Sequence, residues 1–315
     1  PSRLVGSEMC IRDRNYSVVQ IIQYILFPLK AFYWIFINIR NLLYHYEFFS
    51  IHKVKCKVIS VGNLTLGGTG KTPSVIYIAL FLKSLGKSVA ILSRGYGRKT
   101  SGLLLVSDGN GKVLCSCKDS GDEPYMMARR LPDVPVLVDE KRYRGGLFLI
   151  DEFNPEVIIL DDGFQHRSIH RDLDIVLIDG TIEYKNYQLL PYGTLREPWG
   201  SIARADTIMV TKDKPDPIIK QMIDETMLPV LYTNFIPKIK YLDDSSEKIE
   251  RNKDVFIFSG LGNPNFFKKT VKKLGYNICG VKIFSDHHSY KEKDLLDIET
   301  LAKNSGASAM ITTKK

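Results

Sequence analysis

The sequence predicts an α/β fold in which a mostly parallel sheet is flanked by helices and is followed by a second, smaller α/β domain. From Cys56 onward, short runs of β-branched residues alternate with segments of helical periodicity, and this alternation is typical of parallel βαβ units. Polar and charged residues without a clear period occupy residues 228–253, after which the alternation resumes at Val255. A chain of 315 residues is long enough for two domains, each with its own core.

The elements of both domains follow from these runs in chain order. The run KVISV predicts the first strand, and the helix after it ends at Gly86, the residue type most common just beyond a helix C-terminus. In the larger domain the expected strands are 57–61, 88–92, 134–138, 157–160, 174–179 and 207–212, and the expected helices are 72–85, 123–131 and 142–151. In the smaller domain we expect strands at 255–260, 279–284 and 308–312 and helices at 265–274 and 290–304.

We expect five segments along the chain. Residues 1–14, PSRLVGSEMCIRDR, lack the apolar core and cleavage site of a signal peptide and are interpreted as a non-native leader. A helical N-terminal segment at 15–50, the larger domain at 51–227, a linker at 228–253 and the smaller domain at 254–315 follow. The final residues, ASAMITTKK, have the pattern of a strand that stops before its turn and helix. We therefore expect the smaller domain to be truncated.

The N-terminal segment is rich in Ile, Leu, Phe and Tyr between residues 18 and 44. A membrane-spanning helix needs about 20 consecutive apolar residues, whereas Pro28, Lys30 and Arg40 interrupt this run. The pattern fits an amphipathic helix packed on the domain, and it equally fits a helix lying in a membrane interface with its cations near lipid phosphates. The residues alone leave both alternatives open.

Composition narrows the class of protein. With 44% hydrophobic and 25% charged residues, the chain has the composition of a soluble globular protein, which excludes wholesale disorder. The net charge of +9 favours an anionic partner, which could be a nucleotide, a nucleic acid or an anionic membrane. The five cysteines are scattered, and only Cys115 and Cys117 lie close together. This spacing predicts free thiols in a reducing compartment.

The stretch VGNLTLGGTGKTP, at 61–73, places glycines, a lysine and a threonine between a strand and a helix. Such a turn directs backbone N–H groups and the positive end of the helix dipole at an anion. In the pattern G-x-x-x-x-G-K-[ST], the lysine reaches the β- and γ-phosphates and the hydroxyl ligates Mg²⁺; here Thr65 replaces the first glycine. The sequence therefore predicts a P-loop NTPase-like domain that binds a nucleotide through Gly67, Gly68, Thr69, Gly70, Lys71, Thr72 and Pro73.

A second part of the nucleotide site is predicted where the apolar run VIIL ends at Asp161 and Asp162. Open α/β sheets bind ligands at the carboxyl ends of their strands, and an aspartate at this place holds Mg²⁺ in P-loop enzymes. Two successive carboxylates before Gly163 favour a metal-binding role over a helix N-cap.

Two further motifs, DDGFQHR at 161–167 and LLPYGTLREP at 189–198, are not generic. Together with VGNLTLGGTGKTP, SRGYGRK, GDEPYMMARR and SDHHSY in this order, they make the chain resemble the tetraacyldisaccharide 4′-kinase family from about residue 28 to the C-terminus. The loop of that family has the same deviant form, which accounts for Thr65.

The resemblance implies a reaction and a location. The family transfers the γ-phosphate of ATP to the 4′-hydroxyl of a tetraacylated glucosamine disaccharide 1-phosphate, which gives lipid IVA in lipid A biosynthesis. It implies that residues 15–50 associate peripherally with the cytoplasmic face of the bacterial inner membrane. The anionic substrate and lipid surface would explain the net charge. We expect a monomer that binds no nucleic acid.

The resemblance also implies roles at the nucleotide. Phosphoryl transfer requires mainly positioning and electrostatic stabilisation. Lys71 is expected to hold the β- and γ-phosphates and Thr72 to ligate Mg²⁺. Asp161 and Asp162 match the acidic pair of the family at the metal, and Glu197 is expected as a further carboxylate at the metal.

At the acceptor, Asp122 matches the catalytic aspartate of the family and is expected to take the proton of the sugar hydroxyl. The residues alone would equally fit a helix cap at this place. His287 matches the histidine that pairs with this aspartate. The residues expected to contact the lipid substrate are Arg142, Gln165, His166, Arg167 and Tyr96, with Arg94 in the same cleft.

Two other function classes are alternatives to the kinase. Deviant-Walker switch ATPases carry a lysine before the paired glycines, where this chain has Leu66. A nucleotide-sensing or nucleic-acid-binding protein is compatible with the charge, but the sequence has neither an aromatic-interleaved basic stripe nor zinc-module spacing. The switch ATPase is the stronger of these two alternatives.

Overall fold

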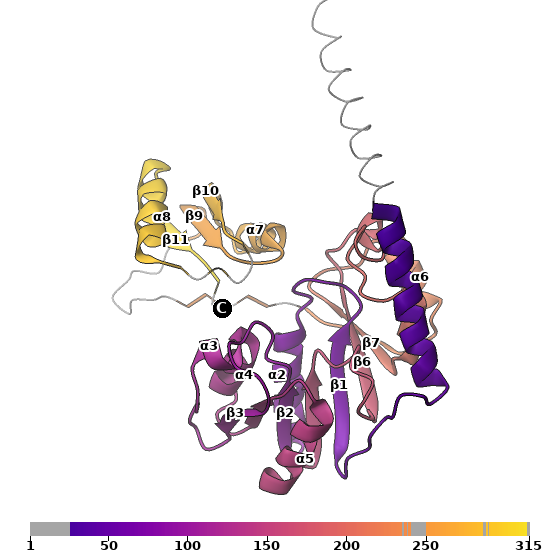
Figure 1. The fold of residues 1–315 in the computed structure, drawn as a ribbon. Helices are drawn as coiled ribbons and strands as arrows, with labels where there is room; N and C mark the ends of the chain where they lie inside the picture. The colour runs from indigo at the N-terminus through magenta and orange to yellow at the C-terminus, as the bar shows by residue number, and fades with distance from the viewer. Residues whose placement is uncertain are drawn as a thin grey trace, which may run out of the picture. The chain divides into compact units, whose positions relative to one another are not determined.

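The structure is a computed structural model that describes residues 26–313 except 235, 238, 241–249, 286, 287 and 289 (Figure 1). The chain divides into two compact units, Pro1–Thr233 and Asn234–Lys315. The predicted leader at 1–14 and His287 both lie outside the described residues.

The first unit is built on an eight-stranded sheet with the order β3-β4-β2-β5-β1-β6-β7-β8. Its strands are β1 (Lys57–Asn63), β2 (Val89–Ser93), β3 (Leu104–Asp108), β4 (Pro135–Val138), β5 (Val157–Asp161), β6 (Leu173–Asp179), β7 (Thr207–Thr211) and β8 (Val230–Tyr232). All neighbouring strands run parallel except β3 and β4. The predicted α/β class with a mostly parallel sheet is confirmed.

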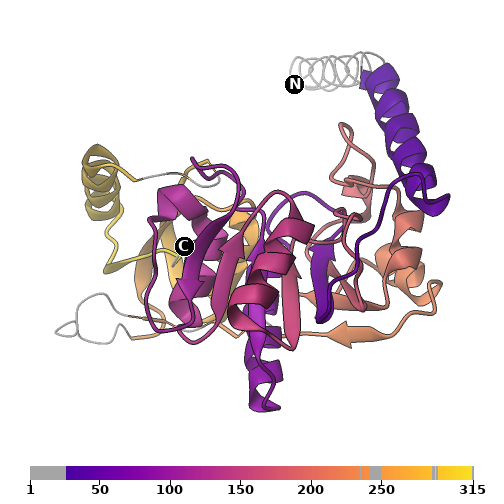
Figure 2. The ribbon, with the colours of Figure 1, turned by 60° about the horizontal axis from the view of Figure 1, so that its bottom comes forward.

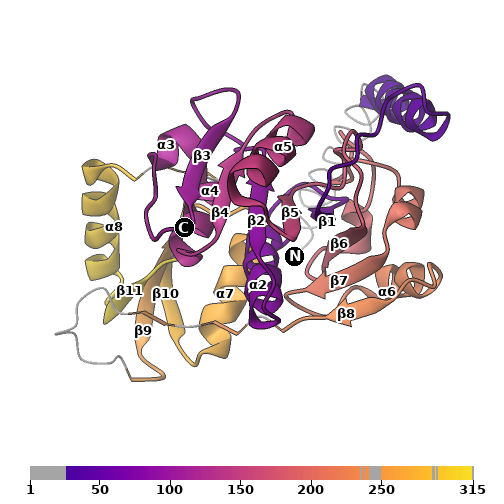
Figure 3. The same ribbon diagram turned by 90° about the horizontal axis from the view of Figure 1, so that it is seen from below.

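Helices cover both faces of this sheet. They are α2 (Lys71–Ser84), α3 (Cys117–Ser120), α4 (Asp122–Arg130), α5 (Arg142–Phe153) and α6 (Pro217–Asp224), and Tyr184–Asn186 and Trp199–Arg204 form 3₁₀ turns. In β5, Ile159 packs in the cluster that contains α2 and α4, whereas Ile158 and Leu160 pack with α5 on the opposite face (Figure 3). Because both faces are covered, the central strands are continuous runs of buried Val, Ile and Leu.

Four helices and strands of this unit, β3, α3, α6 and β8, were not predicted. Strand β3 pairs antiparallel at the edge of the sheet, and α6 follows β7. Strand β8, inside the segment predicted as a linker, pairs with β7 through three residues only. A strand this short, with only its first residue partly buried, has too few apolar positions to show a period.

The second unit has a three-stranded parallel sheet with the order β10-β9-β11. Its elements are β9 (Asp254–Ser259), α7 (Pro264–Lys273), β10 (Asn277–Ile283), α8 (Glu292–Asn304) and β11 (Ala309–Ile311). Successive residues of β9 face opposite sides, since Val255 and Ile257 pack with α7 and Phe256 packs with α8. All five elements were predicted from the sequence.

The described part of the N-terminal segment is helical over 26–45 and lies on the side of the sheet where β6, β7 and α6 are found (Figures 1 and 2). Ile37 is its one fully buried apolar side chain, whereas Phe32 and Phe36 are 74% and 58% exposed. The helix is attached by the Tyr33 hydroxyl, which donates to the Arg196 carbonyl at 2.8 Å. Among the described residues, no helix combines the length and the hydropathy that crossing a bilayer requires.

Candidate active site

The glycine-rich loop joins the central strand β1 to α2, so that it lies at the carboxyl edge of the sheet. Gly70 precedes the helix with φ = 88°, a left-handed conformation that glycine adopts without strain. No side chain caps the start of α2. The first turn of the helix therefore presents N–H groups suited to an anion.

The loop is braced by the end of strand β7 and by a loop distant in sequence. The Thr211 hydroxyl at the end of β7 donates to the Thr69 carbonyl at 2.8 Å, and the Lys212 ammonium contacts the Gly68 carbonyl. On the other side, the Leu66 N–H donates to the Thr194 carbonyl at 2.6 Å. These contacts hold the loop in place without using the N–H groups of the first turn of α2.

Lys71 reaches back from the start of α2 over the end of β1. Its ammonium lies 3.2 Å from Asn63 Oδ1 and 3.5 Å from Asp162 Oδ1. Its side chain is only 16% exposed. The ammonium is therefore held at the mouth of the loop by a carboxylate, a position from which it can turn to a phosphate.

Asp161 and Asp162 follow β5, which is hydrogen-bonded to β1, so the two carboxylates lie beside the loop. Asp161 is buried and accepts from the Ser93 hydroxyl at 2.8 Å, while its Oδ1 atom is buried without a hydrogen-bond partner among the described residues. Burial, together with the neighbouring Asp162 charge, raises the pKa of Asp161 to about 6. A buried carboxylate with one unpaired oxygen is a group that a cation would stabilise.

Asp162 differs from its neighbour. Its side chain is 35% exposed and accepts two hydrogen bonds from the Arg196 guanidinium at 2.9 and 3.0 Å. Burial acts to raise its pKa, but Lys71 and Arg196 outweigh this effect and lower it. Arg196 was not singled out from the sequence, although it stands in the motif LREP next to Glu197.

Glu197 is placed among arginines. Its carboxylate is fully buried, 2.7 Å from Arg40 of the N-terminal helix and 2.9 Å from Arg204, and the Asn41 amide donates to it at 3.2 Å. Burial raises the pKa of Glu197, but the two guanidinium groups lower it more. Among the residues with described side chains, no three His, Cys, Asp or Glu groups are arranged to hold a metal ion. The structure thus does not bring Glu197 together with Asp161 and Asp162.

Gln165 and His166, which follow the acidic pair, contact different residues. The Gln165 amide donates to the Asn63 carbonyl at 2.8 Å, beside Lys71. His166 lies 2.8 Å from the Ser168 hydroxyl, and burial and nearby arginines, Arg142 among them, lower its pKa to about 4.

Arg167 and Arg142 contact different parts of the first unit. The Arg167 guanidinium donates to the Asn41 carbonyl at 3.1 Å and stacks on Tyr44, both in the N-terminal helix. Arg142 is 2% exposed and donates to the Asp139 carbonyl at 2.7 Å. Burial lowers its pKa to about 10, against the attraction of Asp161 and Asp162.

Asp122 is the first residue of α4, and Tyr96 lies in the loop that packs against this helix start. Gly121, with φ = 91°, leaves no room for a side chain, because a Cβ atom there would lie 2.8 Å from the Tyr96 carbonyl. Tyr96 itself is 76% exposed. The predicted pairing of Asp122 with His287 stays a prediction, while the adjacent His288 lies 3.0 Å from Asp294 within the second unit.

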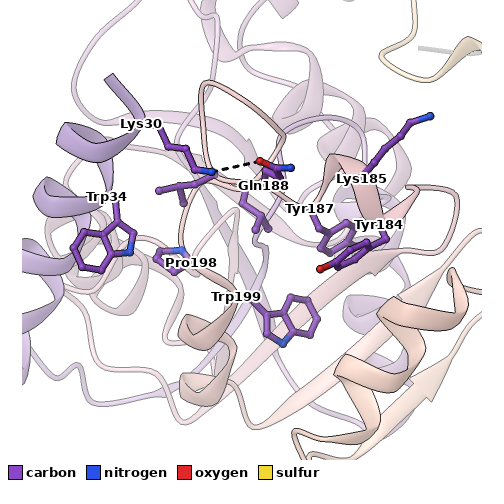
Figure 4. A pocket seen from close by; sticks show the side chains of 10 residues that line it. Lys30, Trp34, Tyr184, Lys185, Tyr187, Gln188, Pro198 and Trp199 are labelled. Carbon is purple, nitrogen blue, oxygen red and sulfur yellow. Dashed lines mark hydrogen bonds between the residues drawn. The ribbon is translucent and has the colours of Figure 1, made fainter. Parts of the chain in front are cut away.

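A pocket of about 340 Å³ lies between the N-terminal helix and residues 184–199 (Figure 4). Aromatic rings and two lysines dominate its wall, which consists of Lys30, Trp34, Tyr184, Lys185, Tyr187, Gln188, Leu189, Leu195, Pro198 and Trp199. Lys30 reaches across it to the Gln188 side chain at 3.4 Å. Leu195 and Pro198 flank Arg196 and Glu197, so this wall adjoins the residues that bind Asp162 and Arg40.

Known proteins match this chain over most of its length. The family model described as tetraacyldisaccharide-1-P 4′-kinase matches residues 22–315. A tetraacyldisaccharide 4′-kinase of Chlorobaculum tepidum is 40% identical over 297 residues, which cover 92% of this chain and 85% of the relative. One from Aquifex aeolicus is 43% identical over 269 residues, covering 85% and 83%. The crystal structure of LpxK from Aquifex aeolicus in complex with ATP superimposes with a TM-score of 0.68 at 39% identity, covering 91% of this chain and 92% of that one.

Proposed function

Because the chain belongs to the tetraacyldisaccharide-1-phosphate 4′-kinase family, we propose that it transfers the γ-phosphate of ATP to the 4′-hydroxyl of a tetraacyldisaccharide 1-phosphate. The product is the 4′-phosphorylated precursor of lipid A. The observation that carries this proposal is the cluster of Lys71, Asp161 and Asp162 at the end of β1 and β5, beside a loop built to bind phosphate. The switch-ATPase alternative is not retained.

At the nucleotide, the N–H groups that start α2 and the Lys71 ammonium bind the β- and γ-phosphates of ATP. In the structure the Lys71 ammonium lies 3.5 Å from Asp162 Oδ1. A phosphate bound at the loop replaces Asp162 as the partner of this ammonium. Arg196 keeps Asp162 paired during this exchange, since it holds both carboxylate oxygens.

The residues fit a magnesium ion. Mg²⁺ prefers hard oxygen ligands and retains several waters, so that one or two carboxylates and phosphate oxygens suffice. The Asp161 carboxylate has a buried unpaired oxygen, and Asp162 and the Thr72 hydroxyl supply further oxygens at the same edge. When bound, the ion would neutralise charge on the transferred phosphate. Glu197, held by arginines, is proposed to orient Arg196 and the N-terminal helix from behind this site.

At the acceptor, Asp122 takes the proton of the 4′-hydroxyl as the oxygen attacks the γ-phosphorus and the bond to ADP breaks. Gln165, His166, Arg167, Arg142 and Tyr96 are proposed to contact the disaccharide and its phosphate. His166 acts as a neutral group near pH 7, because its pKa is lowered to about 4.

The helix at 26–45 is proposed to lie on the surface of the inner membrane at its cytoplasmic face, where ATP is available. Its exposed Phe32 and Phe36 provide the apolar contact, and the protein acts there as a peripheral monomer. The pocket beside this helix, with aromatic walls and two lysines, is compatible with an anionic amphiphile.

The experiment is phosphate transfer from γ-labelled ATP with Mg²⁺ to detergent-solubilised tetraacyldisaccharide 1-phosphate. We expect label in the lipid, and a loss of at least ~10²-fold for Asp122→Ala, as is usual for general-base residues. Asp151→Ala, an exposed aspartate of α5, is the matched control and should behave as wild type. ATP hydrolysis without labelled lipid would refute the lipid as the phosphate acceptor. Full activity of Asp122→Ala would refute Asp122 as the general base.

A further inference from the structure

Cys117 contacts the residue proposed as the catalytic base. It is the first residue of α3, Asp122 is the first residue of α4, and Gly121 alone separates the two helices. The Cys117 thiol donates to Asp122 Oδ1 over an Sγ to Oδ1 distance of 3.2 Å. Neither the fold nor the mechanism described above accounts for this contact.

The short helix α3 that carries Cys117 is fixed from both sides. The Ser116 hydroxyl caps it by accepting from the Asp119 N–H, and the Thr100 hydroxyl donates to the Asp119 carbonyl at 2.6 Å. The Lys99 N–H donates to the Lys118 carbonyl at 2.8 Å. The backbone of the turn that carries Cys117 is therefore held by several hydrogen bonds.

The start of α4 is equally constrained. Gly121 adopts φ = 91°, and its Cα faces the Tyr96 carbonyl so closely that a Cβ atom would lie 2.8 Å from it. A left-handed residue without a side chain is thus required between Cys117 and Asp122. This geometry keeps the thiol and the carboxylate on the same side of the turn.

The thiol remains protonated at neutral pH. Burial, the hydrogen bond to Asp122 and the Asp122 charge raise the pKa of Cys117 to about 11, and the charges of Glu123 and Cys115 act in the same direction. A protonated thiol is a donor, and Asp122 as a carboxylate is an acceptor. The thiol can therefore donate to the carboxylate at neutral pH.

We propose that Cys117 is a positioning residue, whose S–H group orients the Asp122 carboxylate toward the 4′-hydroxyl of the sugar. The inference rests on the proposed role of Asp122 as the base. By anchoring Oδ1, the thiol fixes the direction of Oδ2, and by donating to the carboxylate it favours the ionised form that accepts a proton. Small errors in the placement of a reacting group are costly, which gives a weak hydrogen bond a measurable effect.

The first experiment tests the contact without using activity. Iodoacetamide labelling of Cys117 is followed against pH by mass spectrometry in the full chain and in Asp122→Asn. Removing the carboxylate charge should raise the labelling rate at pH 8.5 about tenfold, since thiolates are the reactive form. Cys115, labelled in the same samples, is the internal control and should change less. An unchanged rate at Cys117 would overturn the contact.

The second experiment tests the positioning role. Cys117→Ala should lower kcat for lipid phosphorylation about fivefold to tenfold, leave KM for ATP unchanged and move the acid limb of the pH profile to higher pH. Cys117→Ser, which keeps a donor, should recover most of kcat, and Cys115→Ala should match wild type. Wild-type kinetics of Cys117→Ala, or a serine variant as slow as the alanine variant, would overturn the proposal. If Asp122→Ala were active, the base would be wrong, while the labelling result would still report the contact.

Discussion

The carboxyl edge of β1 and β5 and the N-terminal helix differ in what they bury. At the edge, Asp161 is only 4% exposed. On the helix, the large apolar side chain of Phe32 is 74% exposed. Each region departs from the usual partition of polar and apolar groups, because buried charges and exposed apolar side chains both cost free energy. The buried charge fits the proposed chemistry on a phosphate, and the exposed apolar side chains fit the proposed contact with a membrane surface.

The two regions are joined by a short chain of contacts. Tyr33 and Arg40 of the helix reach the Arg196 carbonyl and the Glu197 carboxylate, and Arg196 in turn holds Asp162. A helix placed on a membrane would thus be connected to the phosphate site through two consecutive residues. The following variants test how far the two regions are separate in energy, in order of decreasing expected effect.

Lys71→Met should have the largest effect. The variant removes the cation from the loop and leaves Asp162 with Arg196. We expect kcat/KM to fall by about 10³-fold, equivalent to about 4 kcal/mol, as for other groups that stabilise transferred charge. Phosphate transfer to lipid is the measurement, and Lys83→Met in the last turn of the same helix is the control. A value within tenfold of wild type would contradict the assigned role.

Glu197→Ala should lower the free energy of unfolding, because Glu197 connects the N-terminal helix to the phosphate site. Arg40 and Arg204, 24% and 20% exposed, would lose their shared carboxylate. Removing one partner of a buried ion pair typically costs about 3 kcal/mol or more. Urea unfolding measures this, and Glu156→Ala, which breaks an exposed pair, should shift the midpoint little. If activity is lost while stability is unchanged, Glu197 is instead a ligand of the metal, as the sequence motif suggested.

Asp161→Asn should stabilise the ligand-free protein by about 3 kcal/mol at pH 7.5 and have little effect near pH 4. The pKa of Asp161 is raised to about 6 in the folded state, above its ordinary value of 3.8. Between these values the folded state binds more protons than the unfolded state, so wild-type stability falls as the pH rises through this window.

Thermal unfolding with EDTA at both pH values measures the effect of Asp161→Asn. Asp162→Asn is the matched control with the opposite sign, because the pKa of Asp162 is lowered and its ionised form is the stabilising one. A parallel pH dependence of wild type and Asp161→Asn would show that the carboxyl group is not strained by burial.

A Phe32→Ser, Phe36→Ser double variant should have the smallest effect on stability, within about 0.5 kcal/mol, because both rings are exposed. Binding to anionic phospholipid vesicles should nevertheless fall at least about tenfold, since each buried aromatic ring contributes more than 1 kcal/mol. Ile37→Ser, at a 4% exposed position of the same helix, should instead destabilise the protein. Unchanged vesicle binding would rule out this face as the membrane contact.

Much of the fold could be predicted because its signals are local. Each apolar run, at β1, β2 or β5, consists of consecutive residues, and the turn residues of the glycine-rich loop directly follow β1. The proximity of Lys71 to Asp162 also follows, since parallel strands that share an edge bring their carboxyl ends together. By contrast, the edge strand β3 and the three-residue β8 escaped prediction, because short edge strands carry little periodicity.

The sequence by itself determined the class of fold and the family, and it supplied the candidates for the residues at the phosphate. The tertiary structure decided the partners of these residues. Arg40 lies 157 positions from Glu197, so that no local pattern could join them. The proximity of Cys117 and Asp122 is local in sequence, but their hydrogen bond depends on the left-handed Gly121 packed against Tyr96. The periodicity of apolar residues fixes which face of a helix or strand is buried. Packing between segments distant in sequence fixes which charged side chains form pairs.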